Sequence, residues 1–257
     1  MKKYYKIFKI SYISFILVTL FFVNVFAAGP DANIIKMKFS FDGIFGTIDK
    51  ASARRGLQVY NEVCSGCHSL EHIAYRNLYD IGLSNDEIKE FASQFEVMAL
   101  PDSDGEVNMR SAIPSDRFVS PYANDNQAKA YNNGAIPPDL SLIIKARAGG
   151  ASYFYSLMKG YESAPEGEEI NGYYNIAYPG NIIAMPQPLY GDDVEYSDGT
   201  EATMEQEIID LVSFLTWTAQ PELNDRKSMG FRVFLFLVFM TTVLFLSYRK
   251  IWKKIKG

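Results

Sequence analysis

The sequence predicts a mainly α-helical, exported domain that is tethered to a membrane by one helix near its C-terminus. Three observations support this prediction. One helical pattern of apolar residues begins near residue 53, a second follows residue 203, and an apolar run extends from Phe231 to Tyr248. Between the two helical patterns the chain is rich in Gly, Pro, Asn and Tyr, which favours loops and short helices.

The first helical pattern leads into a pentapeptide that contains both of the chain's cysteines. Its apolar residues lie along one stripe of a helix: Ala53, Leu57, Tyr60 and Cys64. Residues 64–68 then read Cys-Ser-Gly-Cys-His, the attachment signature of c-type haem. Cys64 and Cys67 are about one helical turn apart, so both sulfurs can reach one porphyrin edge, and His68 follows as an axial iron ligand. The motif predicts one haem c, covalently bound through two thioethers, and electron transfer as the function.

Three other chemistries are conceivable for the same pentapeptide. A redox-active dithiol of thioredoxin type would lie in a βαβ context, and no such alternation is visible. A zinc site would combine Cys64, Cys67, His68 and His72, but these four residues fall within nine positions, too close together for the usual spacing of a structural zinc site. A disulfide between the two cysteines would be strained and would close a loop of little entropic value.

The N-terminal residues indicate export. Residues 1–9 carry four lysines and no acidic residue, and an apolar stretch from Ile10 to Phe26 follows. This pattern predicts a signal peptide over residues 1–27, cleaved after Ala27; an uncleaved N-terminal anchor is the alternative. In either case the haem domain, predicted over residues 28–225, is exported, which suits the attachment of c-type haem outside the cytoplasm.

The C-terminal apolar run predicts a transmembrane anchor over residues 226–249 and a basic tail over residues 250–257. The 18 residues from Phe231 to Tyr248 would form a helix about 27 Å long, close to a hydrocarbon core of about 30 Å. The larger group of basic residues follows the run, so the positive-inside rule places the tail in the cytoplasm and the haem domain in the periplasm of a bacterial inner membrane. A buried core helix is the alternative.

The charge is distributed unevenly along the chain. All 30 acidic residues lie between Asp31 and Asp225, with 13 of the 25 basic residues, so the exported domain carries about −17 although the whole chain carries −5. This excludes nucleic acid as a partner and favours a basic protein that docks by electrostatic steering. Two acidic clusters are candidate docking faces, or solvated loops: Glu166, Glu168 and Glu169, and then Asp192, Asp193, Glu195, Asp198 and Glu201.

The second helical pattern completes the predicted fold. Thr203 and Gln206 have the spacing of a capping box, and Pro221 ends the pattern. A helix that leads into Cys-x-x-Cys-His and a late amphipathic helix are what a class I cytochrome c fold needs. The predicted fold class is therefore mainly α, a class I cytochrome c-like haem domain with long loop insertions, plus one C-terminal transmembrane helix.

A second protein ligand to the iron is expected in a low-spin electron carrier, and methionine raises the potential relative to a second histidine. Met185 is the best placed of nine methionines, in a segment that Pro186 and Pro188 stiffen. Spacing alone does not establish Met185 as the ligand, because most methionines fill cores. His72 is a rival, but it follows His68 too closely to bind the opposite face of the same iron, so we expect it at the surface or in packing.

An ordered set of segments spans nearly the whole mature chain: 49–60, 64–68, 74–78, 132–141, 145–150, 198–204 and the C-terminal anchor. This set resembles one family, cytochrome c1, the haem subunit of the ubiquinol–cytochrome c reductase (bc1) complex. The resemblance implies that Cys64 and Cys67 hold the haem and that His68 and Met185 are its axial ligands. Some relatives carry an additional cysteine pair that this chain lacks, and the segment from Leu83 to Asp116 fits the family less tightly.

The resemblance also implies roles around the haem. Arg147 would pair with a haem propionate through its bidentate guanidinium. Asn132 and Tyr153 would line the haem pocket, and a carbonyl of the Pro137–Pro138 pair would accept a hydrogen bond from the imidazole N–H of His68. Without the family, Arg147, Asn132 and Tyr153 would be ordinary surface or packing residues.

The implied activity is an electron relay with no bond-making step of its own. Cytochrome b and a Rieske iron–sulfur protein are the implied partners in the complex, a cytochrome c is the implied acceptor, and the lipid bilayer holds the anchor. Alternatives of other classes are a stand-alone tethered cytochrome c, a haem enzyme or gas sensor with an open iron site, and a structural membrane subunit.

Overall fold

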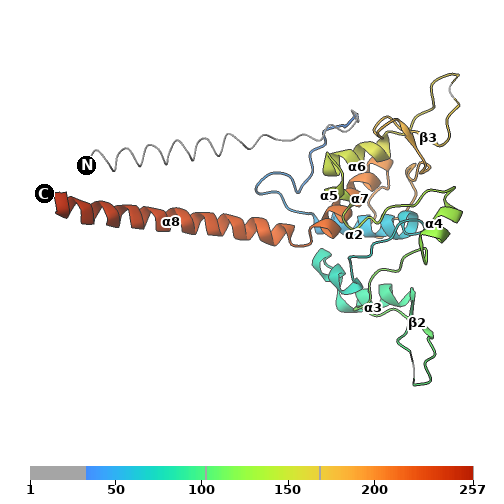
Figure 1. Cartoon of the computed structure of the whole chain (residues 1–257), viewed down its shortest axis with the longest axis horizontal. Helices are drawn as coiled ribbons and strands as arrows, with labels where there is room; N and C mark the ends of the chain where they lie inside the picture. The colour runs from blue at the N-terminus through green and yellow to red at the C-terminus, as the bar shows by residue number, and fades with distance from the viewer. Residues whose placement is uncertain (1–32, 102, 168, 257) are drawn as a thin grey trace. The chain divides into compact units, whose positions relative to one another are not determined.

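The computed structural model describes residues 33–101, 103–167 and 169–256 (Figure 1). The signal peptide predicted over residues 1–27 lies outside the described residues. Within these residues the chain is mainly helical and ends in one long apolar helix, so the predicted fold class is confirmed.

The helical elements follow one another in this order: α2 (Lys50–Val59), the π-helical turn η1 (Tyr60–Cys64), the 3₁₀ helix η2 (Tyr75–Ile81), α3 (Asn85–Ser93), α4 (Asp125–Tyr131), α5 (Ile143–Ala146), α6 (Gly150–Lys159), α7 (Met204–Ala219) and α8 (Leu223–Lys256). The described residues also contain two short antiparallel pairs: β1 (Glu96–Met98) with β2 (Met109–Ser111), and β3 (Tyr173–Tyr174) with β4 (Ile182–Ile183). Neither pair is predicted from the sequence, because strands of two or three residues are too short to show alternation.

Helix α2 carries the predicted apolar stripe into the cysteine motif. Its N-cap is Asp49, whose side chain accepts a hydrogen bond from the backbone N–H of Ala51 at 3.0 Å. Along the stripe Ala53, Leu57 and Tyr60 are buried. The helix then widens into the π-helical turn η1, which ends at the first cysteine.

Helix α7 lies at the centre of the core. Twelve of its 16 residues are buried, as expected for a helix that is covered on nearly all sides. Thr203 caps it by accepting a hydrogen bond from the backbone N–H of Gln206 at 3.2 Å. The reciprocal half of the predicted capping box is wrong, because the Gln206 side chain donates to Asp210 at 3.0 Å instead. The helix ends at Ala219, just before Pro221, as predicted.

The two helices α2 and α7 meet in backbone contact. A Cβ atom added to Gly56 would lie 2.0 Å from the backbone oxygen of Asp210 and 2.7 Å from Cβ of Phe214, so only glycine fits there. Beside this contact the buried carboxylate of Asp210 accepts hydrogen bonds from Ser52 Oγ at 2.6 Å and from Arg55 Nε at 2.8 Å. The hydrogen bond to Asp210 raises the pKa of Arg55 further above its usual range. This ion pair, with Asp210 buried and Arg55 partly exposed, and its hydrogen bonds fix the register of the two helices.

Helix α8 is the apolar helix predicted at the C-terminus. Within the described part of the chain, one helix, over Leu223–Lys253, is long and apolar enough to cross a membrane, and its most apolar stretch is not buried in the protein. The helix begins three residues before the predicted anchor, and its first residue, Leu223, packs in the domain core. Residues 231–253 are exposed except Met240, which is partly exposed. A buried core helix, the alternative considered for this segment, is therefore excluded.

The segment from Leu83 to Asp116 contains α3 and the β1–β2 hairpin. The hairpin presents several exposed apolar side chains: Met98, Leu100, Val107 and Met109. Its base is held by Arg110, which forms an ion pair with Asp116 at 2.6 Å.

The substitution Gly56→Ala tests the contact between α2 and α7. Alanine favours a helix by up to about 1 kcal/mol over glycine. Here the added methyl group would push the two backbones apart, and such overpacking costs about 1–3 kcal/mol. We therefore expect a lower thermal midpoint for the full chain in detergent, followed by circular dichroism. Gly230→Ala in α8, where nothing lies within 4 Å of the added carbon, is the matched control. Equal midpoints for both variants would contradict the close helix contact.

Candidate functional site

The Cys-x-x-Cys-His segment forms one tight turn at the end of η1. The backbone N–H groups of Cys67 and His68 both donate to the carbonyl oxygen of Cys64, at 3.1 and 2.9 Å. Both cysteines are free thiols; Cys64 is partly buried and Cys67 is exposed. Burial raises the pKa of the Cys64 thiol to about 12. The two sulfurs are not joined in a disulfide, so both are available for another bond.

The imidazole of His68 is held in one tautomer. Its Nδ1 lies 2.8 Å from the carbonyl oxygen of Pro138, the contact expected from the resemblance. Because a carbonyl can only accept, Nδ1 carries the proton, and in the neutral ring Nε2 keeps a free lone pair. Burial lowers the pKa of His68, which favours this neutral form. The ring is therefore oriented as a metal-ligating histidine would be.

The loop that carries Pro138 is fastened by Asp139. Its carboxylate accepts hydrogen bonds from Ser69 Oγ at 2.9 Å and from the backbone N–H groups of Glu71 and Ser141, both at 2.8 Å. Burial alone would raise the pKa of Asp139, but these hydrogen bonds lower it overall. Asp139 is not predicted as a site residue, although its place directly after two prolines is typical of a turn-forming aspartate.

A second hydrogen bond steadies the backbone of the motif itself. The hydroxyl of Tyr60 donates to the carbonyl oxygen of His68 at 3.0 Å. Tyr60 lies on the apolar stripe of α2, so the sequence predicts it as a packing residue and does not reveal this polar contact. Through this hydrogen bond, the position of α2 on α7 helps to fix the backbone of His68.

Met185 lies just after strand β4 and is anchored through its backbone. The hydroxyl of Tyr161 donates to the carbonyl oxygen of Met185 at 3.1 Å, and the side chain is partly buried against the core. Farther along the same loop the backbone N–H of Asp193 donates to Glu207 Oε1 on α7 at 2.9 Å. Burial raises the pKa of Glu207 to about 7. Tyr161 and Glu207 are not predicted from the sequence, because each contact joins residues from separate segments.

Arg147 and Tyr153 are placed near each other by α5 and α6. Arg147 is exposed just after α5 and forms no ion pair with the described residues. Tyr153 is buried on α6, where burial raises its pKa and the charge of Arg147 partly opposes the rise. A guanidinium with no protein carboxylate beside it is suited to an anionic group of a ligand.

The remaining predicted residues, Asn132 and His72, take part in other hydrogen bonds than those described above. Asn132 ends α4 and donates to Tyr122 Oη at 3.0 Å and to the carbonyl oxygen of Ala128 at 2.7 Å. His72 is exposed, and its backbone N–H donates to Ser141 Oγ at 3.1 Å. Among residues 33–256 as described, no group of three or more His, Cys, Asp or Glu residues could hold a metal ion, so the zinc alternative gains no support.

The structure brings four of the predicted residues together in one group and places Met185 in another, whereas Arg147, Tyr153 and Asn132 belong to neither. Cys64, Cys67, His68 and Pro138 form the first group, which we call the histidine wall. Met185 lies with Tyr161 in the second group, the methionine wall. Cys64 and Met185 both pack against the same hydrophobic core, while no hydrogen bond or ion pair joins the two walls within the described residues.

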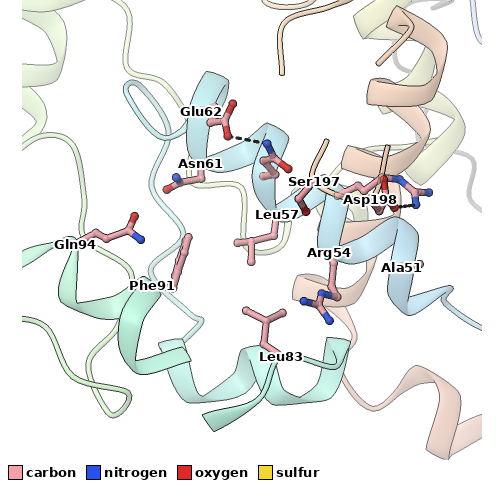
Figure 2. A pocket seen from close by; sticks show the side chains of 12 residues that line it. Ala51, Arg54, Leu57, Asn61, Glu62, Leu83, Phe91, Gln94, Ser197 and Asp198 are labelled. Atoms are coloured by element: carbon pink, nitrogen blue, oxygen red, sulfur yellow. Dashed lines mark hydrogen bonds and ion pairs between the residues drawn. The ribbon is translucent and has the colours of Figure 1, made fainter. Parts of the chain in front are cut away.

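A cavity of about 610 Å³ lies beside α2 and the first residues of η1 (Figure 2). Figure 2 shows it between Arg54 and Leu57 of α2 and Leu83 and Phe91 of the segment around α3. None of the predicted site residues lines it. Its arginines are already paired, Arg54 with Glu87 at 2.9 Å among them, so we do not assign the function to this cavity.

A mainly helical domain with a Cys-x-x-Cys-His segment and one long apolar C-terminal helix is consistent with the class of membrane-anchored cytochromes. The Cytochrome C1 family model matches residues 39–255. A cytochrome c1 of Rhodospirillum rubrum is 44% identical over 239 residues, covering 86% of this chain and 88% of the relative. An Arabidopsis thaliana protein named as a mitochondrial cytochrome c1 heme protein is 44% identical over 219 residues, covering 84% of this chain and 71% of its own length. The cytochrome b/c1 of Bradyrhizobium diazoefficiens is 39% identical over 239 residues, which cover 84% of this chain and 35% of the relative. The chain belongs to the cytochrome c1 family.

Proposed function

We propose that this chain is the membrane-anchored monohaem subunit of a respiratory bc1 complex. In this role it relays one electron at a time from the Rieske iron–sulfur protein to a soluble or tethered cytochrome c. The observation that carries the proposal is the histidine wall, where two free thiols precede a histidine whose Nδ1 is held by Pro138. We assign no bond-making step to the chain.

The residues of both walls fit a haem c by the chemistry of their donor atoms. Two unlinked thiols one turn apart suit two thioether bonds at one porphyrin edge. A neutral imidazole with a free Nε2 and a thioether are the axial donors of c-type cytochromes. The exposed guanidinium of Arg147 suits a propionate. When bound, the haem supplies a one-electron iron couple.

Each residue has its own task in this proposal. Cys64 and Cys67 hold the group, and His68 and Met185 are its axial ligands. Pro138 fixes the tautomer of His68 and raises its basicity as a ligand. Tyr161 positions the Met185 loop through the Met185 carbonyl. Tyr153 and Asn132 line the pocket and Arg147 neutralises a propionate, roles that the family resemblance suggests.

We also propose the membrane arrangement. Residues 1–27 are a signal peptide, residues 28–225 the periplasmic haem domain, residues 226–249 the anchor and residues 250–257 a cytoplasmic tail. The apolar, exposed helix α8 supports a single membrane pass. A relative named cytochrome b/c1 supports cytochrome b as a partner.

The acceptor would dock on an acidic face of the domain. Asp193 and Asp198 of the second acidic cluster are already engaged, Asp193 by the N–H of Tyr190 at 2.6 Å and Asp198 by Arg55 at 2.8 Å. Glu166 and Glu169 of the first cluster are exposed. Asp192, Glu195 and Glu201 of the second cluster are exposed as well. We propose Glu166 and Glu169 as the docking face, because neither forms an ion pair with the described residues whereas Asp198 does.

The substitution Met185→Leu tests the sixth ligand. If Met185 binds the iron, the weak charge-transfer band between methionine sulfur and ferric iron disappears and the midpoint potential falls. Both are measured on the purified full-length protein by absorption spectroscopy and redox titration.

Met204→Leu is the matched control, because Met204 also packs against the core but is not a predicted iron ligand. It should leave band and potential unchanged. A Met185→Leu protein that retains the band would exclude Met185 as the ligand.

The rate of electron transfer to a basic cytochrome c should fall as salt rises. Steered association depends on charges that salt screens, and the rate constant should drop roughly tenfold or more between low and physiological ionic strength. Stopped-flow reduction of the acceptor measures this. The double variant Glu166→Gln/Glu169→Gln should flatten the salt response, whereas Glu195→Gln/Glu201→Gln should change it less. A flat response in the parent protein would remove the case for acidic docking.

A further inference from the structure

A turn near the start of the described chain presents two large apolar side chains to the surroundings. Ile44 is 76% exposed and Phe45 is 75% exposed. Such exposure is unusual for neighbouring large apolar residues, and exposed apolar patches commonly mark interaction sites. Neither residue contributes to the histidine wall or the methionine wall, so neither is explained by the proposed function.

The turn is fastened to the first turns of α8. Lys227 Nζ donates to the carbonyl oxygens of Phe41 and Gly46, at either end of the turn. Asn224 exchanges two hydrogen bonds with the backbone of Ile48, accepting from its N–H at 2.8 Å and donating to its carbonyl at 3.3 Å. These hydrogen bonds fix the turn, so the side chains of Ile44 and Phe45 stay exposed.

The turn also contacts α8 at the residue where the apolar run begins. The rings of Phe45 and Phe231 are in edge contact, with centroids 5.5 Å apart and an interplanar angle of 73°. Phe231 is the first residue of that run, and Arg226 and Lys227 lie five and four residues before it. If α8 crosses the bilayer, Phe231 lies at the surface of the bilayer. Aromatic rings are enriched at this depth.

We propose that the turn carrying Ile44 and Phe45 is a second membrane contact, inserted into the lipid interface beside α8. The occupant is lipid, because the exposed pair is continuous with the exposed apolar surface of α8 through the contact between Phe45 and Phe231. A helix alone leaves a domain free to rotate and tilt. A second contact held to α8 by Lys227 and Asn224 restricts both motions. The inference rests on α8 being a membrane anchor.

Photocrosslinking in native membranes tests this inference. The full-length chain would carry benzoylphenylalanine in place of Phe45, and in separate variants in place of Leu100 or Leu237. Leu100 is 90% exposed between β1 and β2, and Leu237 lies within α8. After irradiation, mass spectrometry of the chain identifies lipid or peptide adducts. We expect lipid adducts at positions 45 and 237, several-fold above the level at position 100.

The outcomes separate this inference from the assignment of the anchor. Lipid adducts at position 237 with none at position 45, or an adduct of position 45 to another polypeptide, would overturn the second contact alone. Absence of lipid adducts at position 237 would overturn the anchor. If the variant at Phe45 fails to accumulate, the same reagent at Ile44 provides the measurement, with the same expected and contradicting results.

Discussion

The contact between α2 and α7 at Gly56 and Asp210 is the constraint on which the rest of the structure depends. Glycine lets the two backbones touch, and the buried carboxylate of Asp210 locks them through Ser52 and Arg55. The chain leaves α2 directly into the cysteine motif, so the seating of this helix determines where both thiols lie. A small residue and a satisfied buried charge thus set the position of the motif although neither touches it.

Helix α7 reaches the same motif by a second route. The Thr218 hydroxyl on α7 shares its proton between the carbonyl oxygen of Leu215 in the same helix, at 2.9 Å, and that of Ser141, at 3.2 Å. Ser141 lies in the loop whose Pro138 carbonyl orients His68. Glu207, on the same helix, holds the loop that follows Met185. One central helix therefore supports both walls of the proposed haem site. This arrangement lets long, irregular loops carry the proposed iron ligands without a disulfide.

The sequence predicts much of the fold because its strongest patterns are local. The stripe of α2, the stop at Pro221 and the apolar run of α8 each depend on neighbouring residues, as does Cys-x-x-Cys-His. The supporting contacts are not predictable in this way. Ser52 and Asp210 are 158 positions apart, and nothing in either segment indicates the other. Only the reciprocal half of the capping box at Thr203 is wrong, because the Gln206 side chain donates to Asp210 four residues along α7 instead.

The central claim is that Cys64 and Cys67 hold one haem through two thioether bonds. The most direct measurement is the intact mass of the denatured, full-length protein from a cell with a competent maturation system, combined with its pyridine haemochrome spectrum. The account predicts the mass of the processed polypeptide plus one haem, and a spectrum characteristic of haem attached through two thioethers. A denatured polypeptide with no haem mass, from a preparation in which other c-type cytochromes are matured, would contradict it.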